Sequence, residues 1–311
     1  MTMRILFWGT PGFSIPSLDM LCTLDEHEVV AVVSQPDKPR GRGRRTVETP
    51  VKKRCLELGL QILQPVKTRD ESFLESVEAL EPDISAIVAY GKILHREILD
   101  LPPSGSVCLH PSLLPLYRGA APIQRTIMDG CTETGVTLFQ IDEGMDTGPI
   151  LLVRHVPMDE QDTLDSLSAR LSEVCAEILV EGLSLISSGE AKPQPQRGNA
   201  TLAPKVSKEE ARIQWEHDAP AIARRVRALC SKPGASTIFD GRTLKIYRAA
   251  PVTEEYSAEP GTVVRTPSDS IVVATGRGWL ALTELQLEGK NRMSASSFQR
   301  GKRMEVGTGL G

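Results

Sequence analysis

Short apolar runs alternate with helical patterns over the first 190 residues. Runs rich in β-branched residues, such as Val29 to Val33, are typical of strands that are covered on both faces. We expect strands at residues 4–8, 29–33, 60–63, 84–91, 106–109, 136–141 and 150–156. Helical spacing predicts helices at about 15–24, 50–58, 70–80, 121–128 and 164–185. This alternation predicts an α/β domain with a doubly wound, mostly parallel, Rossmann-like sheet.

The pattern changes after residue 189. Residues 190–204 are poor in apolar residues and rich in proline, which predicts a linker between a domain at 1–189 and one at 205–311. Asp218 is expected to cap a helix that buries Ile222, Val226 and Leu229 and turns Arg224, Arg225 and Arg227 outward. About five short strands then follow, at 236–239, 244–248, 261–265, 271–274 and 279–287. Short strands with turn residues between them predict a small, OB-like β-barrel.

The composition of the chain is typical of a globular protein. The chain has 311 residues, of which 40% are hydrophobic and 24% charged, as in ordinary globular proteins. Because no apolar run approaches the roughly 20 residues that span a bilayer, and the N-terminus begins directly with a strand, we expect a cytoplasmic location without membrane binding. Six cysteines are scattered without zinc-like spacing, so no metal is expected.

Charge is distributed unevenly along the chain. Residues 205–311 contain 17 Lys and Arg against 12 Asp and Glu, a net +5, whereas residues 1–204 contain 19 against 28, a net −9. Residues 38–45 hold five cations together with glycines and a proline: Lys38, Arg40, Arg42, Arg44 and Arg45. A flexible cationic loop of this kind is suited to phosphate binding, and we expect it to be disordered in the free protein. The alternative is a solvated basic loop without a function.

Two strand ends supply the candidates for chemistry. His110 follows the apolar run 106–109 and opens a loop marked by proline and glycine, and Asp146 lies in a second turn after the strand 136–141. Open α/β sheets place their ligands beyond the carboxyl ends of their strands, so both side chains are candidate catalytic residues. The alternative is a buried, satisfied histidine and an aspartate that only forms a turn. A dinucleotide or P-loop site is disfavoured, because neither glycine fingerprint is present.

The residues around these candidates resemble a known family. The stretches 110–124 (HPSLLPLYRGAAPIQ) and 142–150 (DEGMDTGPI) are similar to the signature of 10-formyltetrahydrofolate-dependent formyltransferases. Supporting matches lie at residues 9–11, 35–37, 64–65, 89–91 and 286–290, so that the resemblance covers about residues 3–303. Within the family, the cationic residues 38–45, called the basic segment here, and the C-terminal barrel resemble the branch that acts on methionyl-tRNA.

This resemblance implies a reaction and a set of site residues. The methionyl ester's free amine on initiator tRNA would attack the formyl carbon of 10-formyltetrahydrofolate, and His110, held by Asp146, would take the proton or stabilise charge. The basic segment would bind the acceptor stem, and the protein is expected to be a monomer. The folate is expected along two short stretches: Ser112, Leu113, Leu114 and Pro115, and the turn Ala89, Tyr90 and Gly91.

Position 108 departs from the family pattern. The family's catalytic asparagine is replaced by Cys108, and a thiol is a weak hydrogen-bond donor. Loss of one donor to a developing oxyanion costs about 2.7–4 kcal/mol, so the enzyme would be slow unless a water or a backbone N–H compensates. A second alternative is that Cys108, beside a base, carries the formyl group as a thioester.

Two other functions stay open at this point. The first is a formyltransferase for an amino sugar nucleotide or a purine precursor, which would not need the basic segment. The second is a tRNA- or folate-binding homologue in which Cys108 marks impaired catalysis.

Overall fold

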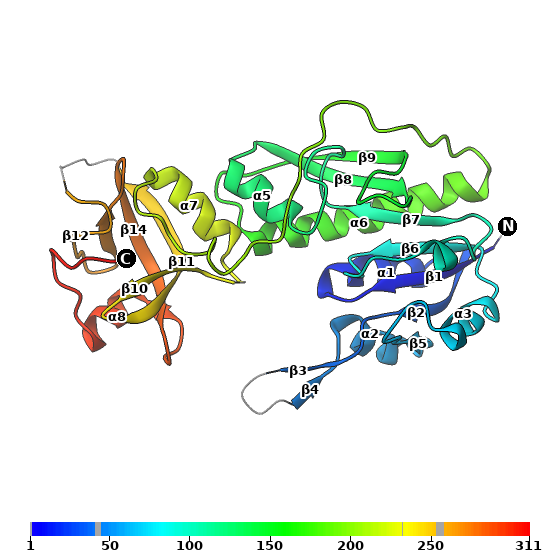
Figure 1. The fold of residues 1–311 in the computed structure, drawn as a ribbon, viewed down its shortest axis with the longest axis horizontal. Coiled ribbons are helices and arrows are strands. Elements are labelled where there is room, and N and C mark those ends of the chain that lie inside the picture. The colour runs from blue at the N-terminus through cyan, green and yellow to red at the C-terminus, as the bar shows by residue number, and fades with distance from the viewer. Residues whose placement is uncertain (1, 41–44, 232, 253–257) are drawn as a thin grey trace. The chain divides into compact units, whose positions relative to one another are not determined.

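The chain forms two compact units in a computed structural model that describes residues 2–40, 45–231, 233–252 and 258–311 (Figure 1). Unit 1 comprises Met1–Pro122, Glu133–Pro157 and Ser168–Ala203. Unit 2 comprises Ile123–Thr132, Met158–Leu167 and Pro204–Gly311. None of the helices in the described ranges has the length and apolar character needed to cross a membrane.

Unit 1 is built on a sheet with the order β5-β2-β1-β6-β7-β8-β9. Its strands are β1 (Met3–Gly9), β2 (His27–Val33), β5 (Ile62–Leu63), β6 (Ile84–Val88), β7 (Ser106–His110), β8 (Glu133–Gln140) and β9 (Ile150–Pro157). Strands β5, β2, β1, β6 and β7 are parallel, whereas β8 is antiparallel to both of its neighbours. The predicted Rossmann-like, mostly parallel sheet is therefore confirmed.

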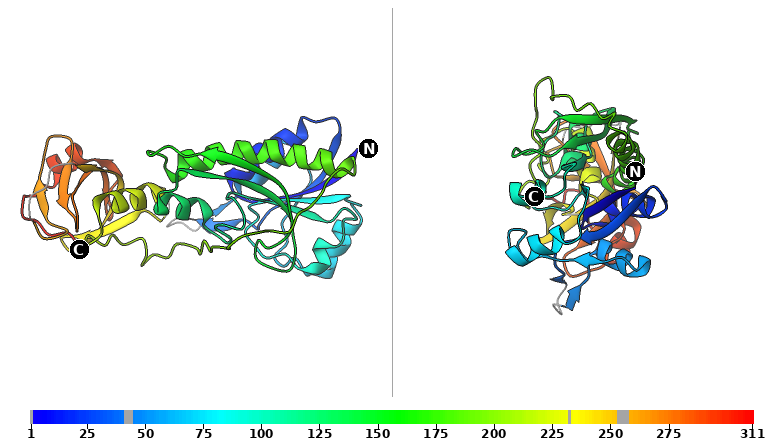
Figure 2. Two further views of the ribbon diagram at one scale, coloured as in Figure 1. Left: turned by 90° about the horizontal axis from the view of Figure 1, so that it is seen from above. Right: turned by 90° about the vertical axis from the view of Figure 1, so that its right-hand side faces the viewer.

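Helices and a short 3-10 turn connect and cover the strands of unit 1. They are η1 (Gly12–Ser14), α1 (Ile15–Cys22), α2 (Pro50–Leu58), α3 (Glu71–Glu78), α4 (Arg96–Leu99) and most of α6 (Leu164–Ser187). Phe73 and Val77 of α3 pack in one buried cluster with alternate β1 residues, Leu6 and Trp8. The long helix α6 runs beside the sheet (Figure 2), and a Cβ at Gly182 would come within 2.0 Å of Leu138 on β8. This glycine therefore permits a close approach of helix and strand.

Unit 2 contains a curled antiparallel sheet that forms a half-barrel. Its strands are β10 (Ala235–Phe239), β11 (Arg242–Val252), β12 (Val263–Arg265), β13 (Ile271–Ala274) and β14 (Trp279–Leu287), in the order β10-β11-β14-β13-β12, with β15 (Met293–Ser294) paired to β14. Its helices are α5 (Pro122–Asp129), α7 (Ala219–Ala228) and α8 (Ala295–Gly301). The predicted small C-terminal β-structure is confirmed. Helix α8 was not predicted, because four of its seven residues are serine, glycine or arginine and give no apolar period.

The arginines of α7 differ from the sequence prediction. Arg224 donates from Nε to the carbonyl of Met128 at 3.1 Å, Arg227 donates from Nε to the carbonyl of Asp162 at 3.2 Å, and Arg225 donates to the carbonyl of Glu210. All three are half-buried instead of turned outward. The reason is that unit 2 includes Ile123–Thr132 and Met158–Leu167, which lie far away in sequence, and a local periodicity cannot show this. These guanidinium groups therefore stabilise unit 2.

The segment expected as a linker makes backbone hydrogen bonds with unit 1. Its residues up to Ala203 belong to unit 1, and Gln194 exchanges two backbone hydrogen bonds with Ile150, at 2.7 and 2.8 Å. Further along, the backbone of Arg118 pairs with Thr201 and Ala203. The segment thus adds backbone pairing to unit 1, although its composition gives no strand pattern.

The basic segment begins and ends in regular structure. Strands β3 (Lys38–Arg40) and β4 (Arg45–Val47) pair antiparallel, with Lys38 opposite Val47 and Pro39 opposite Thr46. The expectation of a flexible loop over residues 38–45 is wrong at these two ends, since proline fits an extended strand at an edge. Arg42, Arg44 and the expected disorder of the loop between the strands lie outside the described residues.

Asp37 ties the base of this two-stranded ribbon to unit 1. Its Oδ2 accepts a hydrogen bond from Lys52 Nζ at 2.5 Å, and its Oδ1 accepts one from Gln64 Nε2 at 2.9 Å. These two bonds hold the pKa of the Asp37 carboxyl below its usual value. Gln64 also donates to the carbonyl of Gln35 at 2.9 Å. The stretches 35–37 and 64–65, which resemble the family, therefore contact each other.

We predict that Thr49→Ala lowers the free energy of unfolding by about 1 to 2 kcal/mol. Thr49 caps α2 by accepting from the N–H of Lys52 at 3.1 Å, and its hydroxyl also lies 2.8 Å from Ser34 Oγ. Urea unfolding, followed by circular dichroism, measures the change. Thr49→Ser keeps the hydroxyl and should stay within about 0.5 kcal/mol of the natural protein, as should Thr23→Ala at an exposed position. A Thr49→Ser variant as unstable as Thr49→Ala would contradict the capping role.

We also predict that Asp37→Asn destabilises the protein at pH 7 and much less at pH 3. The pKa of Asp37 is lower in the folded protein, so its contribution is fully present above the unfolded-state value of about 3.9 and is lost as the pH falls through the folded value. Urea unfolding at both pH values tests this, with the exposed Asp25→Asn as control. A destabilisation by Asp37→Asn that is equal at both pH values would show that the ionised carboxylate is not responsible.

Candidate active site

Strand β7 places Cys108 and His110 on one face of the sheet. Alternate residues of a strand share a face, and His110 is the last residue of β7. The neighbouring strand β6 pairs Val88 with Leu109, so that the turn beginning at Ala89 comes next to His110. Two of the sequence-predicted stretches are thus brought together at the carboxyl ends of parallel strands, where open α/β sheets bind their ligands.

The imidazole of His110 is buried, with a hydrogen bond at one nitrogen and a carboxylate near the other. Its Nε2 lies 2.8 Å from the carbonyl oxygen of Tyr117, and its side chain is 7% exposed. Since a carbonyl can only accept, Nε2 carries a proton in this arrangement. Nδ1 lies 3.6 Å from Asp146 Oδ2. Nδ1 is therefore the nitrogen that can take up a proton, and the resulting positive charge would face a carboxylate.

Asp146 is held in a tight loop between β8 and β9. Its backbone has φ +54°, which is uncommon for a residue other than glycine, and its Oδ2 accepts from the N–H of Gly119 at 2.8 Å. Asp142 closes the same loop by accepting from the N–H of Gly144 at 3.0 Å and from the hydroxyl of Thr147 at 2.5 Å. A Cβ at Gly148 would overlap the Gln140 carbonyl, so glycine is required there. The loop thus presents one carboxylate in a fixed direction.

The thiol of Cys108 is directed into apolar surroundings. The residue packs against the buried cluster that includes Trp8 and Ile87, and Sγ lies 3.7 Å from the carbonyl of Leu109. Burial, with a smaller contribution from the charge of Asp146, raises the pKa of the Cys108 thiol. The thiol is protonated at neutral pH, unlike the low-pKa cysteines that act as nucleophiles.

The loop after His110 is rigid because β8 holds it from inside. Thr137 donates from Oγ1 to the carbonyl of Ser112 at 2.7 Å and accepts from the N–H of Leu114 at 3.1 Å. The hydroxyl of Ser112 donates to the carbonyl of Leu116 at 2.6 Å, and the Leu114–Pro115 peptide bond is cis. Several backbone groups of this stretch therefore already have partners within the protein.

The turn at residues 89–91 has an unusual backbone conformation and places one side chain, that of Tyr90, in the core. Ala89 has φ +52° and Gly91 φ +80°. The ring of Tyr90 is buried against Trp8, with centroids 5.0 Å apart, and burial raises the pKa of Tyr90 to about 12. The carbonyl of Tyr90 accepts from Thr10 Oγ1 at 2.9 Å and from Gln35 Nε2 at 2.7 Å. The turn is thus fixed by the strand-end segments beside it.

Three residues that hold the two loops of this site were not among the predicted site residues. Thr137, inside a predicted strand, bonds the loop after His110, and Asp142 closes the loop of Asp146. Gln196, in the expected linker, bonds the carbonyl of Asp146. Asp142 had two signals that could have revealed it: it begins the stretch 142–150 that resembles the family, and an aspartate two residues before a glycine favours a turn. Arg118 belongs to the stretch that resembles the family and donates from Nε and Nη2 to Gln196 Oε1, at 3.1 and 2.6 Å.

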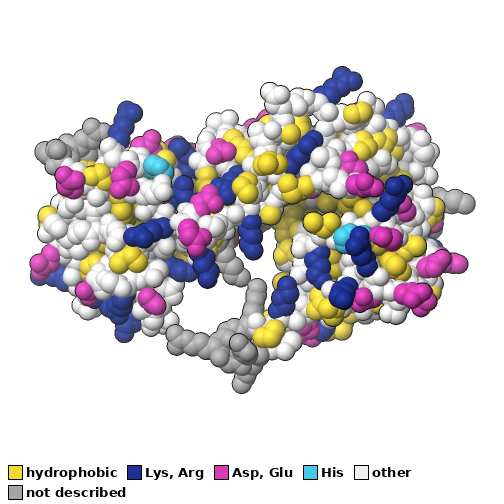
Figure 3. Space-filling view, in the orientation of Figure 1, with side chains coloured by type: hydrophobic (Ala, Val, Ile, Leu, Met, Phe, Trp, Pro, Cys, Tyr) yellow, Lys and Arg dark blue, Asp and Glu magenta, His cyan; other side chains and the backbone are white. Residues whose placement is uncertain are grey.

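Cationic side chains and a pocket occur elsewhere on the protein. Lys and Arg are interspersed with Asp and Glu on the visible surface (Figure 3), so positive charge is not confined to residues 38–45.

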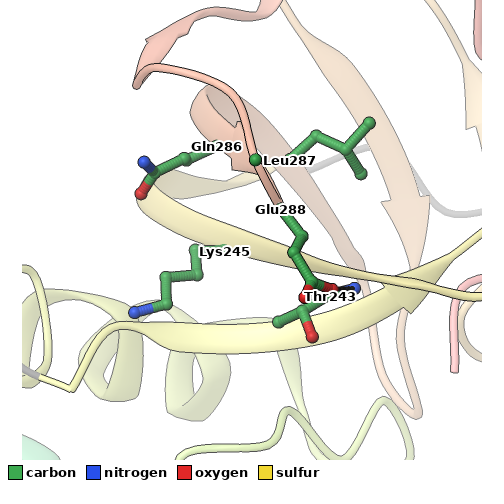
Figure 4. Close-up of a pocket in the computed structure, with 6 residues that line it drawn as sticks. Thr243, Lys245, Gln286, Leu287 and Glu288 are labelled. Carbon is green, nitrogen blue, oxygen red and sulfur yellow. Dashed lines mark hydrogen bonds between the residues drawn. The ribbon is translucent and has the colours of Figure 1, made fainter. Parts of the chain in front are cut away.

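In unit 2 a pocket of about 330 Å³ is lined by Thr243, Lys245, Gln286, Leu287, Glu288 and Gly289 (Figure 4). Lys245 Nζ donates to the carbonyl of Pro233 at 2.8 Å, and Gln286 accepts from the hydroxyl of Tyr247. Among the described residues, no group of three or more His, Cys, Asp or Glu could hold a metal ion.

Comparisons with known proteins cover both halves of the chain. Residues 3–183 match the formyl transferase family and residues 205–303 its C-terminal domain. The chain is similar to methionyl-tRNA formyltransferase of Pelotomaculum thermopropionicum, 44% identical over 310 residues, and to that of Thermus thermophilus, 43% identical over 309 residues. Each match covers 99% of both chains.

Solved structures of other proteins have the same fold as this chain. Methionyl-tRNA formyltransferase from Clostridium thermocellum has a TM-score of 0.60 at 20% identity, over 81% of this chain and 95% of that one. HypX from Aquifex aeolicus in complex with tetrahydrofolic acid has a TM-score of 0.68 at 24% identity, over 96% of this chain. The match covers 47% of HypX, about half of its length. From its two matched domains and its full-length relatives, the chain belongs to the formyl transferase family.

Proposed function

We propose that this protein transfers the formyl group of 10-formyltetrahydrofolate to the free amino group of methionyl initiator tRNA in the cytoplasm, as a step of translation initiation. The observation that carries the proposal is the match at 44% identity to a methionyl-tRNA formyltransferase, which extends over both units. The contacts of His110 support the same chemistry, because Nε2 bonds a carbonyl while Nδ1 lies 3.6 Å from a carboxylate that can stabilise positive charge on the ring.

His110 acts as the general base and Asp146 as its partner. The substrate amine attacks the formyl carbon, a new C–N bond forms, and the bond from that carbon to N10 of the folate breaks. The amine loses one proton and N10 gains one. Nδ1 of His110 can take the first proton, since Nε2 is committed to the Tyr117 carbonyl. The imidazolium then lies next to Asp146, which lowers its free energy.

Cys108 acts beside this pair as a neutral, weakly donating group. A thioester route would need a thiolate, and burial raises the pKa of this thiol instead of lowering it. We therefore propose direct transfer of the formyl group from the folate to the amine. A water or a backbone N–H supplies the stronger donor to the developing oxyanion.

The folate lies along two rigid surfaces in this proposal. One is the loop of Ser112, Leu113, Leu114 and Pro115, and the other is the turn of Ala89, Tyr90 and Gly91. Both are held by hydrogen bonds from neighbouring segments and flank the end of β7. Preorganised loops lose little entropy on binding, which favours affinity for a flat pterin ring.

The tRNA contacts the basic segment and residues 205–311 in this proposal. Lys38, Arg40, Arg42, Arg44 and Arg45 bind phosphates, while the positively charged C-terminal part adds to the attraction. Residues 1–189 then carry the catalytic site, residues 190–204 connect the two parts, and residues 205–311 bind tRNA. The protein acts as a monomer that needs no metal.

One observation favours a second candidate function. Cys108 stands where the family signature has asparagine, so a homologue that binds tRNA or folate but has lost most of its catalysis is the alternative. Turnover distinguishes the two functions, because binding alone would leave the formyl group on the folate.

We predict that the natural protein formylates methionyl-tRNA in single-turnover assays and that Cys108→Asn changes the rate by less than about tenfold. A tolerated thiol implies that another donor already serves the oxyanion. Cys22→Asn, at an exposed position, is the matched control. An inert natural protein that gains turnover with Cys108→Asn would instead establish the impaired homologue.

We also predict that Lys38→Ala combined with Arg40→Ala weakens tRNA binding and reduces the salt dependence. Each lost phosphate contact lowers the slope of log affinity against log salt by about one. Filter binding from about 50 to 200 mM salt measures the slope, with the exposed Lys53→Ala on α2 as the control. An unchanged slope would remove the basic segment from the tRNA site and favour a small amino-group substrate.

A further inference from the structure

Residues 194–203, named the strap here, lie against both loops that present the candidate catalytic pair. At its start, Gln194 exchanges backbone hydrogen bonds with Ile150, just after the Asp146 loop. At its end, Ala203 donates its N–H to the carbonyl of Arg118 at 2.7 Å and accepts from the N–H of Ala121 at 3.0 Å, in the His110 loop. All of these contacts are within unit 1. The strap therefore connects two loops that come from different strand ends.

Gln196 is the strap residue that bonds to the Asp146 loop by its side chain. Its Nε2 donates to the carbonyl of Asp146 at 2.8 Å and to the carbonyl of Gly148 at 2.9 Å. Its Oε1 accepts from Nε and Nη2 of Arg118. The amide can take only one orientation here, because carbonyls accept and a guanidinium donates. Arg118 thus anchors Gln196, and Gln196 holds two backbone carbonyls of the loop.

The Asp146 loop needs such support. Asp146 has a left-handed backbone, and residues in this region persist only where surrounding contacts hold them. The direction of its carboxylate depends on that backbone and on the N–H of Gly119, which belongs to the same segment as Arg118. Release of the Asp146 carbonyl would let the loop relax and would move the carboxylate away from His110 Nδ1.

We propose, on the basis of the function proposed above, that Gln196 is a positioning residue for formyl transfer. Its amide N–H groups fix the backbone of Asp146 and thereby keep the carboxylate 3.6 Å from His110 Nδ1. Gln196 acts through Asp146 and does not contact the reacting atoms. Arg118 has a matching role, because it fixes the orientation of the Gln196 amide.

Kinetics of three variants test the proposal. Gln196→Ala should lower kcat by about 10- to 100-fold with KM for folate and for tRNA within about twofold, since misplacement of a catalytic group affects the chemical step. Gln196→Glu keeps an acceptor for Arg118 but loses the donor to Asp146, so it should be at least as slow. Gln194→Ala is the matched control: it is exposed, and its side chain bonds only the nearby carbonyl of Lys192 among the contacts described for it. A Gln196→Glu variant with natural kcat would overturn the proposal.

Hydrogen exchange gives a readout that does not depend on the reaction. Exchange in peptides that span residues 142–149 should rise in Gln196→Ala and Gln196→Glu, and stay at the natural rate in Gln194→Ala. A rise spread evenly over unit 1, or none in this loop, would contradict positioning and indicate a general structural role. If the natural protein does not formylate methionyl-tRNA, the proposed function fails, while the exchange of this loop still decides whether Gln196 holds Asp146.

Discussion

The hydrogen bond from His110 Nε2 to the carbonyl of Tyr117 is the constraint on which the site depends. It assigns the proton to Nε2 and leaves Nδ1 as the nitrogen that faces Asp146. Because the accepting carbonyl belongs to the loop that His110 itself begins, the loop and the imidazole fix each other. The internal hydrogen bonds of that loop, through Thr137 and Ser112, thus matter for protonation as well as for shape.

Two strand-end loops meet at this imidazole, and neither is held by its own strand alone. The His110 loop is supported from β8, and the Asp146 loop is supported from the strap. Arg118 and Gly119 link the two, since one bonds the strap and the other bonds the Asp146 carboxylate. A histidine and an aspartate that are positioned by such loops require supporting contacts, because fixing a loop backbone opposes its conformational entropy.

Sequence patterns predicted the helices and strands well, but they did not predict the contacts that hold the loops of the site. Helical spacing over residues 50–58 located α2, and apolar runs located β6 and β7, because the period of apolar residues is a local property. His110 and Asp146 were candidates because an apolar run precedes each of them. In the structure His110 is the last residue of β7, and Asp146 lies in the loop that follows β8. Gln196 could not be found, since its partners are backbone carbonyls about 50 residues away in a segment without periodicity. The arginines of α7 were misplaced for the same reason, as distant segments cover them.

The cysteine at position 108, where the family pattern has asparagine, changes which groups can stabilise negative charge in the proposed site. Cys108 and His110 are two residues apart on one strand face, about 7 Å from each other, and the Cys108 thiol packs against the apolar cluster that includes Trp8 and Ile87. A neutral thiol donates weakly to an oxyanion, whereas an imidazolium carries a full charge once Nδ1 is protonated. In the proposed reaction, proton transfer to His110 therefore creates positive charge at the stage when the formyl oxygen becomes negative. In the proposed reaction, with a thiol at position 108, the charged histidine stabilises that oxygen together with the water or backbone N–H donor, so the contacts that keep Asp146 beside His110 matter as well.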